Sequence, residues 1–207
     1  LQEFMRRFHS AKEALTQVFG YADFRPHQEE IIEAVIEGRD ALVLMPTGGG
    51  KSLCYQIPAL VREGTAVIVS PLIALMQDQI TVIQNRGLEA ACLSSANSLE
   101  ENREIESQFL SGTLDFLYVT PERLVNEWTI SMLQRARVSL FAVDEAHCVV
   151  TWGHDFRPEY GALGLLKERF PSVPRIALTA TADASAQQEI AERLLIDPKI
   201  FITSFDR

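Results

Sequence analysis

The side chains best suited to chemistry lie in one short stretch, Pro46-Thr47-Gly48-Gly49-Gly50-Lys51-Ser52. Three successive glycines let the backbone bend so that several N–H groups converge on one anion. Lys51 can then reach the β- and γ-phosphates of a nucleotide, and the Ser52 hydroxyl can ligate Mg²⁺. A glycine turn followed by an exposed lysine is the simpler interpretation. The apolar segment 41–45 and the helix-compatible segment 51–61 favour a phosphate-binding loop instead, because such a loop joins a strand to a helix.

A pair of carboxylates follows another apolar segment, in Val143-Asp144-Glu145-Ala146-His147. At the carboxyl end of a strand, Asp144 can reach a metal ion, usually through its water shell. Glu145 points the other way and can polarise the water that attacks a γ-phosphate. Two solvated acids at a strand end are the alternative. The phosphate-binding loop favours the catalytic interpretation, with Ser52 and Asp144 as the Mg²⁺ ligands.

Two other strand ends carry a hydroxyl residue followed by proline, Ser70-Pro71 and Thr120-Pro121. A hydroxyl N-cap with proline at the first helical position starts a helix well, and this structural role is sufficient by itself. A helix N-terminus at the carboxyl edge of a sheet also binds phosphate. With Arg123 as a nearby cation, we predict that Ser70, Thr120 and Arg123 contact a DNA backbone.

The segment 152–160, Trp-Gly-His-Asp-Phe-Arg-Pro-Glu-Tyr, combines large aromatic residues with an arginine where glycine and proline leave little room for regular structure. A buried aromatic plug is one interpretation. Stacking of aromatic and arginine side chains on unpaired bases is the other. Because the segment directly follows the acidic motif, we predict that Trp152, His154, Phe156 and Arg157 link strand binding to hydrolysis.

Thr179 and Thr181 are two small hydroxyl residues just after the apolar run 175–178. We expect them beside the strand end that carries the acidic motif. They either cap the next turn or bond to the acidic motif and carry its state toward a partner surface.

These groups need a scaffold, and the apolar pattern predicts one. Short runs that are apolar at nearly every position suit strands covered on both faces. Such runs lie at 41–45, 66–69, 90–93, 115–119, 140–143, 175–178 and 200–202. Helical segments separate them, so we expect an α/β fold with a mostly parallel twisted sheet and helices on both faces. Without a repeat or linker, residues 1–207 are expected to form one domain.

Helix signals lie between these runs. Pro26 is placed to open a helix with an inward stripe, Gly38 to end it, and Ser98 and Glu101 have the spacing of a capping box. Asp183 is the expected N-cap of a helix that runs to about residue 195. The expected inward stripes are Ile31, Ile32, Val35 and Ile36 in the first helix and Leu72, Leu75, Met76, Ile80 and Ile83 in a later one.

The composition excludes several classes of protein. Hydrophobic residues at 47% and charged residues at 23% are ordinary globular values. The net charge of −9 argues against wrapping nucleic acid with a basic surface, so DNA contacts must be local. No apolar run approaches membrane-spanning length. The three cysteines are far apart, which predicts small buried hydrophobes in a reducing compartment rather than a zinc site or reactive thiols.

Six stretches carry a family resemblance that covers nearly the whole chain. They are residues 19–28 (FGYADFRPHQ), 45–52 (MPTGGGKS), 70–79 (SPLIALMQDQ), 144–148 (DEAHC), 152–160 (WGHDFRPEY) and 177–182 (ALTATA). The chain resembles the first RecA-like motor lobe of a RecQ-family DNA helicase. The 152–160 segment is the most specific of the six. Met45 replaces the first glycine of the general phosphate-loop pattern, as helicase motors tolerate, and Val150-Thr151 replaces the more polar residues usual before the loop tryptophan.

The resemblance implies functional roles and partners. Tyr21 and Arg25 would sandwich the adenine of ATP and Gln28 would read its polar edge, with Thr47 to Ser52 on the phosphates and Mg²⁺. Lys51, Asp144, Glu145 and His147 would be the catalytic residues. The family resemblance also implies 3′→5′ unwinding of single-stranded and forked DNA in repair and recombination. A second RecA-like lobe would follow in the same parent chain, so this piece alone should be largely inactive. We expect a monomer away from membranes, in the bacterial cytoplasm in preference to a eukaryotic nucleus.

Two alternatives from other classes remain at this stage. One is a phosphate-loop ATPase domain that acts as a regulated interaction module without strand separation. The other is a passive single-strand binder, against which Lys51, Glu145 and the negative charge argue.

Overall fold

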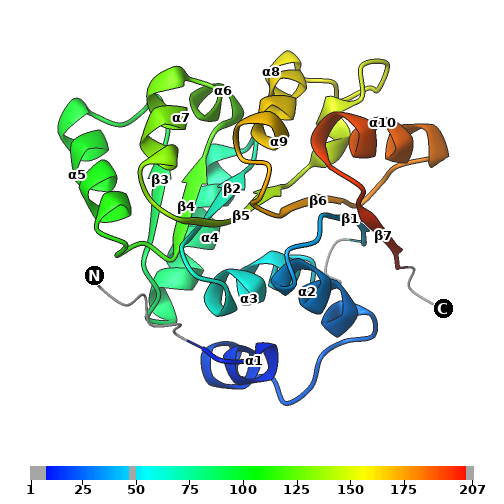
Figure 1. Cartoon of the computed structure of the whole chain (residues 1–207), viewed down its shortest axis with the longest axis horizontal. Coiled ribbons are helices and arrows are strands. Elements are labelled where there is room, and N and C mark those ends of the chain that lie inside the picture. The colour runs from blue at the N-terminus through cyan, green and yellow to red at the C-terminus, as the bar shows by residue number, and fades with distance from the viewer. Residues whose placement is uncertain (1–7, 47–49, 204–207) are drawn as a thin grey trace.

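The computed structural model describes residues 8–46 and 50–203 (Figure 1). In these residues seven strands form one sheet in the order β3-β4-β2-β5-β6-β1-β7, and every strand pairing is parallel. The strands are β1 (Ala41–Leu44), β2 (Thr65–Val69), β3 (Ala90–Leu93), β4 (Phe116–Val119), β5 (Val138–Val143), β6 (Arg175–Thr179) and β7 (Lys199–Ile202). All seven predicted apolar runs are therefore strands, and the α/β prediction is confirmed.

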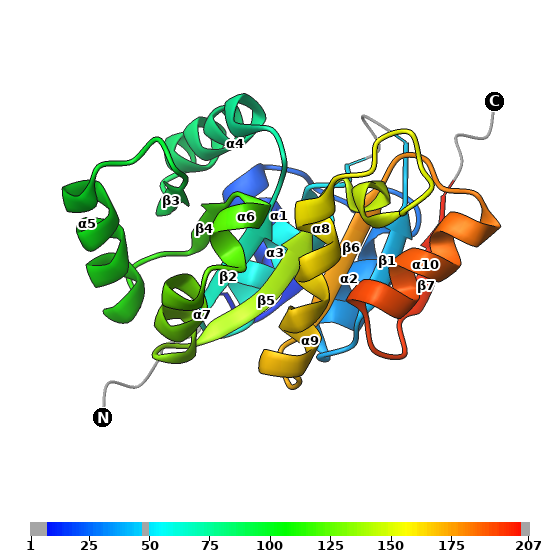
Figure 2. The same cartoon turned by 90° about the horizontal axis from the view of Figure 1, so that it is seen from above.

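Helices cover both faces of the sheet, as Figure 1 shows and Figure 2 confirms from above. One face packs against α1 (Ala11–Phe19), α2 (Gln28–Ile36), α3 (Leu53–Val61) and α4 (Ile73–Asn85). The other packs against α5 (Leu99–Leu110), α6 (Pro121–Leu124), α7 (Glu127–Gln134), α8 (Pro158–Gly161), α9 (Leu165–Arg169) and α10 (Ala184–Leu194). Val67 and Ile68 show how successive strand residues enter opposite cores. The runs are apolar at every position because both faces are buried.

Several helix ends follow their local sequence signals. Ser98 and Glu101 form the predicted capping box at the start of α5. The Asp183 side chain accepts a hydrogen bond from the Ala186 N–H and caps α10 as predicted. Gly38 has a φ of 91°, a conformation that glycine adopts without strain, just after α2 ends at Ile36.

Other helix predictions were wrong in position. α4 begins at Ile73 rather than at Pro71, and the Ser70 hydroxyl instead accepts from the Leu72 N–H. Thr120 and Pro121 do occupy the N-cap and first positions of α6, but the Thr120 hydroxyl makes no capping bond. α2 begins at Gln28, two residues after Pro26.

The inward stripe predicted for α4 was also partly wrong. Met76, Ile80 and Ile83 are buried, whereas Leu72 precedes the helix and is exposed, as is Leu75. This helix carries apolar residues on two faces, and only one of them faces the sheet.

A buried ion pair joins three strands at their amino ends. Asp40 and Arg175 are each 3% exposed at the side chain, with Arg175 Nε 3.0 Å from Asp40 Oδ2. The Asp40 carboxylate also accepts from the backbone N–H groups of Arg175 and Ile196, and its carbonyl accepts from the Lys199 N–H. Because these bonds satisfy the buried carboxylate, the pair aligns β1, β6 and β7 without leaving an uncompensated charge.

The three thiols are buried, as predicted. Burial raises the pKa of Cys54 to about 12 and the pKa values of Cys92 and Cys148 to about 11. Such thiols carry little thiolate at neutral pH and are poor nucleophiles. Across the residues that the structure covers, no helix has the length and apolar character needed to cross a bilayer.

Candidate active site

A cleft of about 570 Å³ lies at the carboxyl edge of the sheet, where parallel α/β sheets bind ligands. It brings together three parts of the chain that are far apart in sequence. They are the segment before α2 (Tyr21, Arg25, Gln28), the end of the phosphate-binding loop (Gly50, Lys51, Ser52) and the acidic motif after β5 (Asp144, Glu145). The other predicted loop residues, Thr47, Gly48 and Gly49, lie outside the described residues.

The phosphate-binding lysine faces the acidic motif. Lys51 Nζ lies 3.7 Å from Asp144 Oδ1, and the two side chains are only 17% and 9% exposed. Ser52 lines the same cleft at the start of α3. A hydroxyl and a carboxylate are the oxygen ligands that Mg²⁺ prefers beside substrate phosphates, so Ser52 and Asp144 fit this ion. Among the described residues, no group of three or more His, Cys, Asp or Glu side chains is arranged to hold a metal without such a substrate.

The backbone at the acidic motif has an unusual conformation. Glu145 has a φ of 53° and a ψ of 42°, in the left-handed region that a non-glycine residue rarely adopts. The Glu145 N–H donates to Asp144 Oδ1 at 2.9 Å, and the Tyr160 hydroxyl donates to the Asp144 carbonyl at 2.9 Å. Burial raises the pKa of Tyr160 well above its ordinary value, so its hydroxyl keeps the proton that it donates. These bonds fix the peptide between the two carboxylates.

His147 lies at the centre of a polar cluster next to this peptide. Its Nδ1 is 2.9 Å from the Thr179 hydroxyl, and its Nε2 is 3.5 Å from Glu145 Oε2 and 3.6 Å from Asp155 Oδ2. The Thr179 hydroxyl also lies within hydrogen-bond distance, 3.1 Å, of the Thr181 carbonyl. Thr179 therefore supports a turn and also bonds to the acidic motif, while its role in carrying the state of that motif toward a partner surface stays a prediction.

Gln28 connects the end of the cleft that is expected to bind the nucleotide base to the end that is expected to bind the phosphates. Its side-chain amide donates to the Gly50 carbonyl at 3.0 Å and accepts from the Arg25 N–H at 3.0 Å. Gly50 has a φ of 82°, and a Cβ at this position would collide with the Gln28 amide. Among the described residues, one N–H and one acceptor position of Gln28 have no partner, which is compatible with the predicted contact to a nucleotide base.

Sequence reasoning missed the wall that faces these residues. Tyr21 is half exposed at the rim of the cleft, and the opposite wall comes from α4. The α4 side of the wall consists of Leu75, Asp78, Gln79, Val82 and Arg86. The second apolar face of α4, Leu75 with Val82 seven residues later, was the sequence signal for it.

The segment 152–157 forms an exposed loop, which we call the aromatic loop. Trp152 is 96% exposed, so the interpretation of Trp152 as a buried plug was wrong. Phe156 and Arg157 line a hollow of about 490 Å³ together with His147 and Glu145. Glu145 therefore borders both the nucleotide cleft and the hollow beneath the aromatic loop.

Comparisons with known proteins agree with this geometry. The family model described as DEAD/DEAH box helicase matches residues 25–190. The chain belongs to the DEAD/DEAH box helicase family. It is 49% identical to ATP-dependent DNA helicase RecQ of Pasteurella multocida over 199 residues, which are 96% of this chain and 32% of that protein. It is 44% identical to ATP-dependent DNA helicase RecQ of Bacillus subtilis, over 96% of this chain and 34% of that protein. The chain thus spans about a third of the length of these relatives.

Solved helicase structures share the RecA-like fold. A hypothetical ATP-dependent RNA helicase from Sulfolobus tokodaii matches with a TM-score of 0.68 at 16% identity, over 93% of this chain and 56% of that one. The Pyrococcus furiosus Hef helicase domain matches with a TM-score of 0.67 at 21% identity, over 89% and 39% of the two chains. At these identities the likeness concerns the fold alone.

The DNA-contact residues predicted at other strand ends of this helicase domain are less accessible. Ser70 and Thr120 are buried, and the Thr120 hydroxyl has no hydrogen-bond partner among the described residues. The Arg123 guanidinium lies 5.2 Å from the centre of the Trp128 ring. Neither residue therefore presents appreciable surface to DNA in this structure, and their predicted contact with a DNA backbone stays a prediction.

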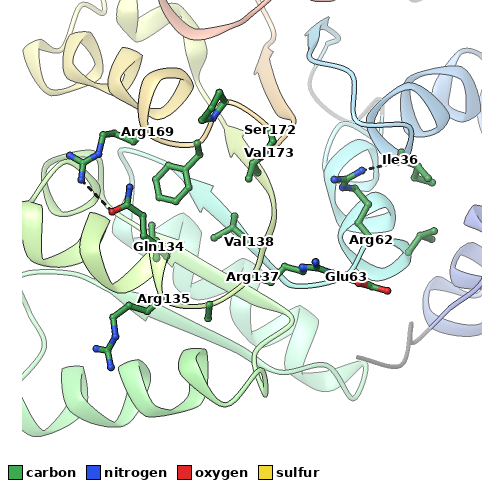
Figure 3. A pocket seen from close by; sticks show the side chains of 15 residues that line it. Ile36, Arg62, Glu63, Gln134, Arg135, Arg137, Val138, Arg169, Ser172 and Val173 are labelled. Atoms are coloured by element: carbon green, nitrogen blue, oxygen red, sulfur yellow. Dashed lines mark hydrogen bonds and ion pairs between the residues drawn. The ribbon is translucent and has the colours of Figure 1, made fainter. Parts of the chain in front are cut away.

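A larger hollow, of about 820 Å³, lies at the opposite edge of the helicase sheet (Figure 3). Val138 lines it at the start of β5, so it opens at the amino ends of the strands. Its arginines already have partners in the chain. Arg169 bonds to Gln134 and Glu127, Arg62 donates to the Ile36 carbonyl, and Arg137 pairs with Glu63. We therefore place the chemistry in the smaller cleft that holds Lys51 and Glu145.

Proposed function

We propose that this chain is the nucleotide-binding motor lobe of a RecQ-type ATP-dependent DNA helicase. In this proposal, ATP hydrolysis drives movement along single-stranded DNA and the separation of a duplex, in DNA repair and recombination. The observation that carries the proposal is the position of Glu145, which borders both the nucleotide cleft and the hollow beneath the aromatic loop. A group in that position can respond to DNA and act on ATP.

The residues of the cleft have distinct roles in this mechanism. Tyr21, Arg25 and Gln28 bind the adenine, while Lys51 and the loop N–H groups bind the phosphates. Lys51 Nζ lies 3.7 Å from Asp144 Oδ1, so the proposed phosphate ligand and the proposed Mg²⁺ ligand meet at one point of the cleft. Bound Mg²⁺ would neutralise charge that develops on the phosphates.

Glu145 and His147 act around the attacking water. The Glu145 carboxylate orients that water toward the γ-phosphate and accepts its proton. His147 holds Glu145 on one side and Asp155 of the aromatic loop on the other. Displacement of the loop by a bound strand would change these contacts and thereby the position of Glu145.

The remaining partners follow from the RecQ resemblance. A second RecA-like lobe of the same parent chain would complete the ATP site and the DNA track. Single-stranded and forked DNA are the proposed substrates, with 3′→5′ polarity. We propose a monomeric enzyme that acts in the cytoplasm of a bacterium or, in a eukaryote, in the nucleus.

ATPase assays of the complete enzyme, with and without single-stranded DNA, test the proposal. We expect DNA to stimulate hydrolysis. Lys51→Ala should abolish most nucleotide binding because the ammonium that contacts the phosphates is lost. Glu145→Gln should retain ATP and Mg²⁺ but lose most of kcat. Hydrolysis that DNA does not stimulate would indicate an interaction module, and near-normal turnover by Glu145→Gln would assign the water to another residue.

A further inference from the structure

The residue before Trp152 is tied to α10 by a closed set of hydrogen bonds. The Thr151 N–H and hydroxyl both donate to Glu189 Oε1, at 3.1 Å and 2.9 Å. Arg193 Nη2 donates to the Thr151 hydroxyl at 3.0 Å, and Arg193 Nε lies 3.1 Å from Glu189 Oε1. The Thr151 hydroxyl therefore uses its proton on Glu189 and accepts from Arg193. We call these three residues the loop-root cluster.

The cluster fixes one end of a loop whose first side chain is exposed. Trp152, the next residue, is 96% exposed. The other end of the loop is held by a backbone hydrogen bond from the Arg157 N–H to the Cys148 carbonyl at 3.0 Å. Within the loop, the Gly153 N–H also donates to the Val150 carbonyl at 3.0 Å, so the chain on both sides of Trp152 is held.

Helix α10, which carries Glu189 and Arg193 of the loop-root cluster, begins beside the acidic motif. α10 starts at Ala184, shortly after Thr179 and Thr181, and Thr179 bonds to His147. Glu189 and Arg193 lie one turn apart on this helix. One rigid element therefore connects the residues around His147 to the base of the aromatic loop.

We propose that Thr151, Glu189 and Arg193 are positioning residues that hold the base of the aromatic loop against α10. With the base held, DNA binding at the exposed Trp152 side chain alters the contacts of the acidic motif. This inference rests on the proposed role of the loop in DNA-stimulated hydrolysis. If the foot of the loop is not held, part of the free energy of stacking on nucleobases is spent on ordering the loop. More DNA is then needed for the same stimulation.

The test measures, in the complete enzyme, the concentration of a single-stranded oligonucleotide that gives half-maximal stimulation of ATP hydrolysis. Thr151→Val keeps the size of the side chain but removes both hydroxyl bonds. We expect this concentration to rise about ten-fold, equivalent to about 1.4 kcal/mol. Basal ATPase activity and melting temperature should stay near those of the parent. Glu189→Ala, which also removes the acceptor of the Thr151 N–H, should have a larger effect, and Thr151→Ser should restore the parent value because it retains the hydroxyl.

Thr129→Val is the matched control. Thr129 lies on α7, is fully buried, and its hydroxyl has no hydrogen-bond partner among the described residues. The same substitution there removes no bond, so half-maximal stimulation should not change. The inference is overturned if Thr151→Val behaves like Thr129→Val, if Thr151→Ser does not restore the parent value, or if basal and stimulated rates fall together.

Trp152→Ala separates this inference from the proposed function. If Trp152→Ala abolishes stimulation while Thr151→Val leaves it intact, the loop-root cluster is not a positioning device and the function stands. If Trp152→Ala is fully stimulated by DNA, the aromatic loop does not sense DNA and both proposals fail.

Discussion

The peptide between Asp144 and Glu145 is the place where we expect the loss of one hydrogen bond to change ATP hydrolysis most. A non-glycine residue in the left-handed region costs about 1–3 kcal/mol unless its surroundings hold it there. The fully buried Tyr160 hydroxyl bonds to the carbonyl of this peptide. Because Tyr160 lies on α8, which begins at Pro158 directly after the aromatic loop, this bond also links the end of the loop to the proposed catalytic carboxylates.

Tyr160→Phe should lower kcat for ATP hydrolysis roughly ten-fold, with and without DNA, by releasing the orientation of Glu145. Loss of this buried bond should reduce the free energy of unfolding by about 0.5–1.5 kcal/mol. Tyr118→Phe is the control, since Tyr118 is equally buried and its hydroxyl has no hydrogen-bond partner among the described residues. Kinetic assays and thermal unfolding of both variants in the complete enzyme check this. Equal kcat values for the two variants would contradict the role of Tyr160.

Gln28→Ala should affect both nucleotide choice and stability. The Gln28 side chain holds Gly50 and Arg25 together, so its loss leaves a carbonyl and an N–H without these bonds. We expect a loss of about 1–3 kcal/mol if these groups stay unsatisfied, and a smaller preference for ATP over GTP. Binding titrations with both nucleotides and thermal unfolding measure the two effects. Unchanged selectivity would assign adenine recognition to other residues.

At the scale of elements, the aromatic loop places none of its side chains in the two hydrophobic cores. Trp152, the first residue of this loop, is almost fully exposed. Glu145 lines the hollow beneath the loop. Stacking on a base is worth about 1–3 kcal/mol, enough to reorder a short loop but far less than a domain core provides.

Trp152→Ala should therefore leave the stability of the fold unchanged but remove the stimulation of ATP hydrolysis by DNA. In the complete enzyme we expect its free energy of unfolding to stay within about 0.5 kcal/mol of the parent, because the side chain is exposed. Basal ATPase activity should be retained, while DNA stimulation and unwinding are lost. Leu99→Ala is the control, since Leu99 is 78% exposed on the distant helix α5 and should change none of these properties. A melting temperature many degrees lower, with stimulation intact, would make the loop a structural element.

At the scale of the whole molecule, one sheet presents one side of the proposed ATP site. The cleft contains Lys51 and the two carboxylates, which are the proposed catalytic groups. In other phosphate-loop enzymes an arginine supplied from outside the nucleotide-binding element accelerates hydrolysis by about 10³–10⁵. The proposed second lobe would supply such a charge.

Residues 1–207 by themselves should bind ATP weakly, hydrolyse it very slowly and unwind no DNA. The same assays on the complete enzyme, at equal concentration, give the reference values. Robust unwinding of a forked duplex by residues 1–207 alone would contradict the two-lobe model.

The local pattern of the sequence determined the scaffold and the main parts of the site. Continuous apolar runs predicted all seven strands, because a strand buried on both faces carries few polar residues. The Ser98–Glu101 capping box and the Asp183 cap were also predictable, since each is completed within three residues of chain. Parallel strands place their carboxyl ends at one edge, so Lys51, Asp144 and Glu145 were expected to meet.

Only the tertiary structure decided which polar groups bond across that scaffold. Tyr160 reaches Asp144 over 16 residues, Thr151 reaches Glu189 over 38, and Arg175 reaches Asp40 over 135. No local pattern encodes such pairs, because their distance depends on how the helices pack on the sheet. The same reason explains the errors: the Ser70 and Thr120 hydroxyls, expected at helix ends facing DNA, are buried by packing that their neighbours in sequence do not reveal.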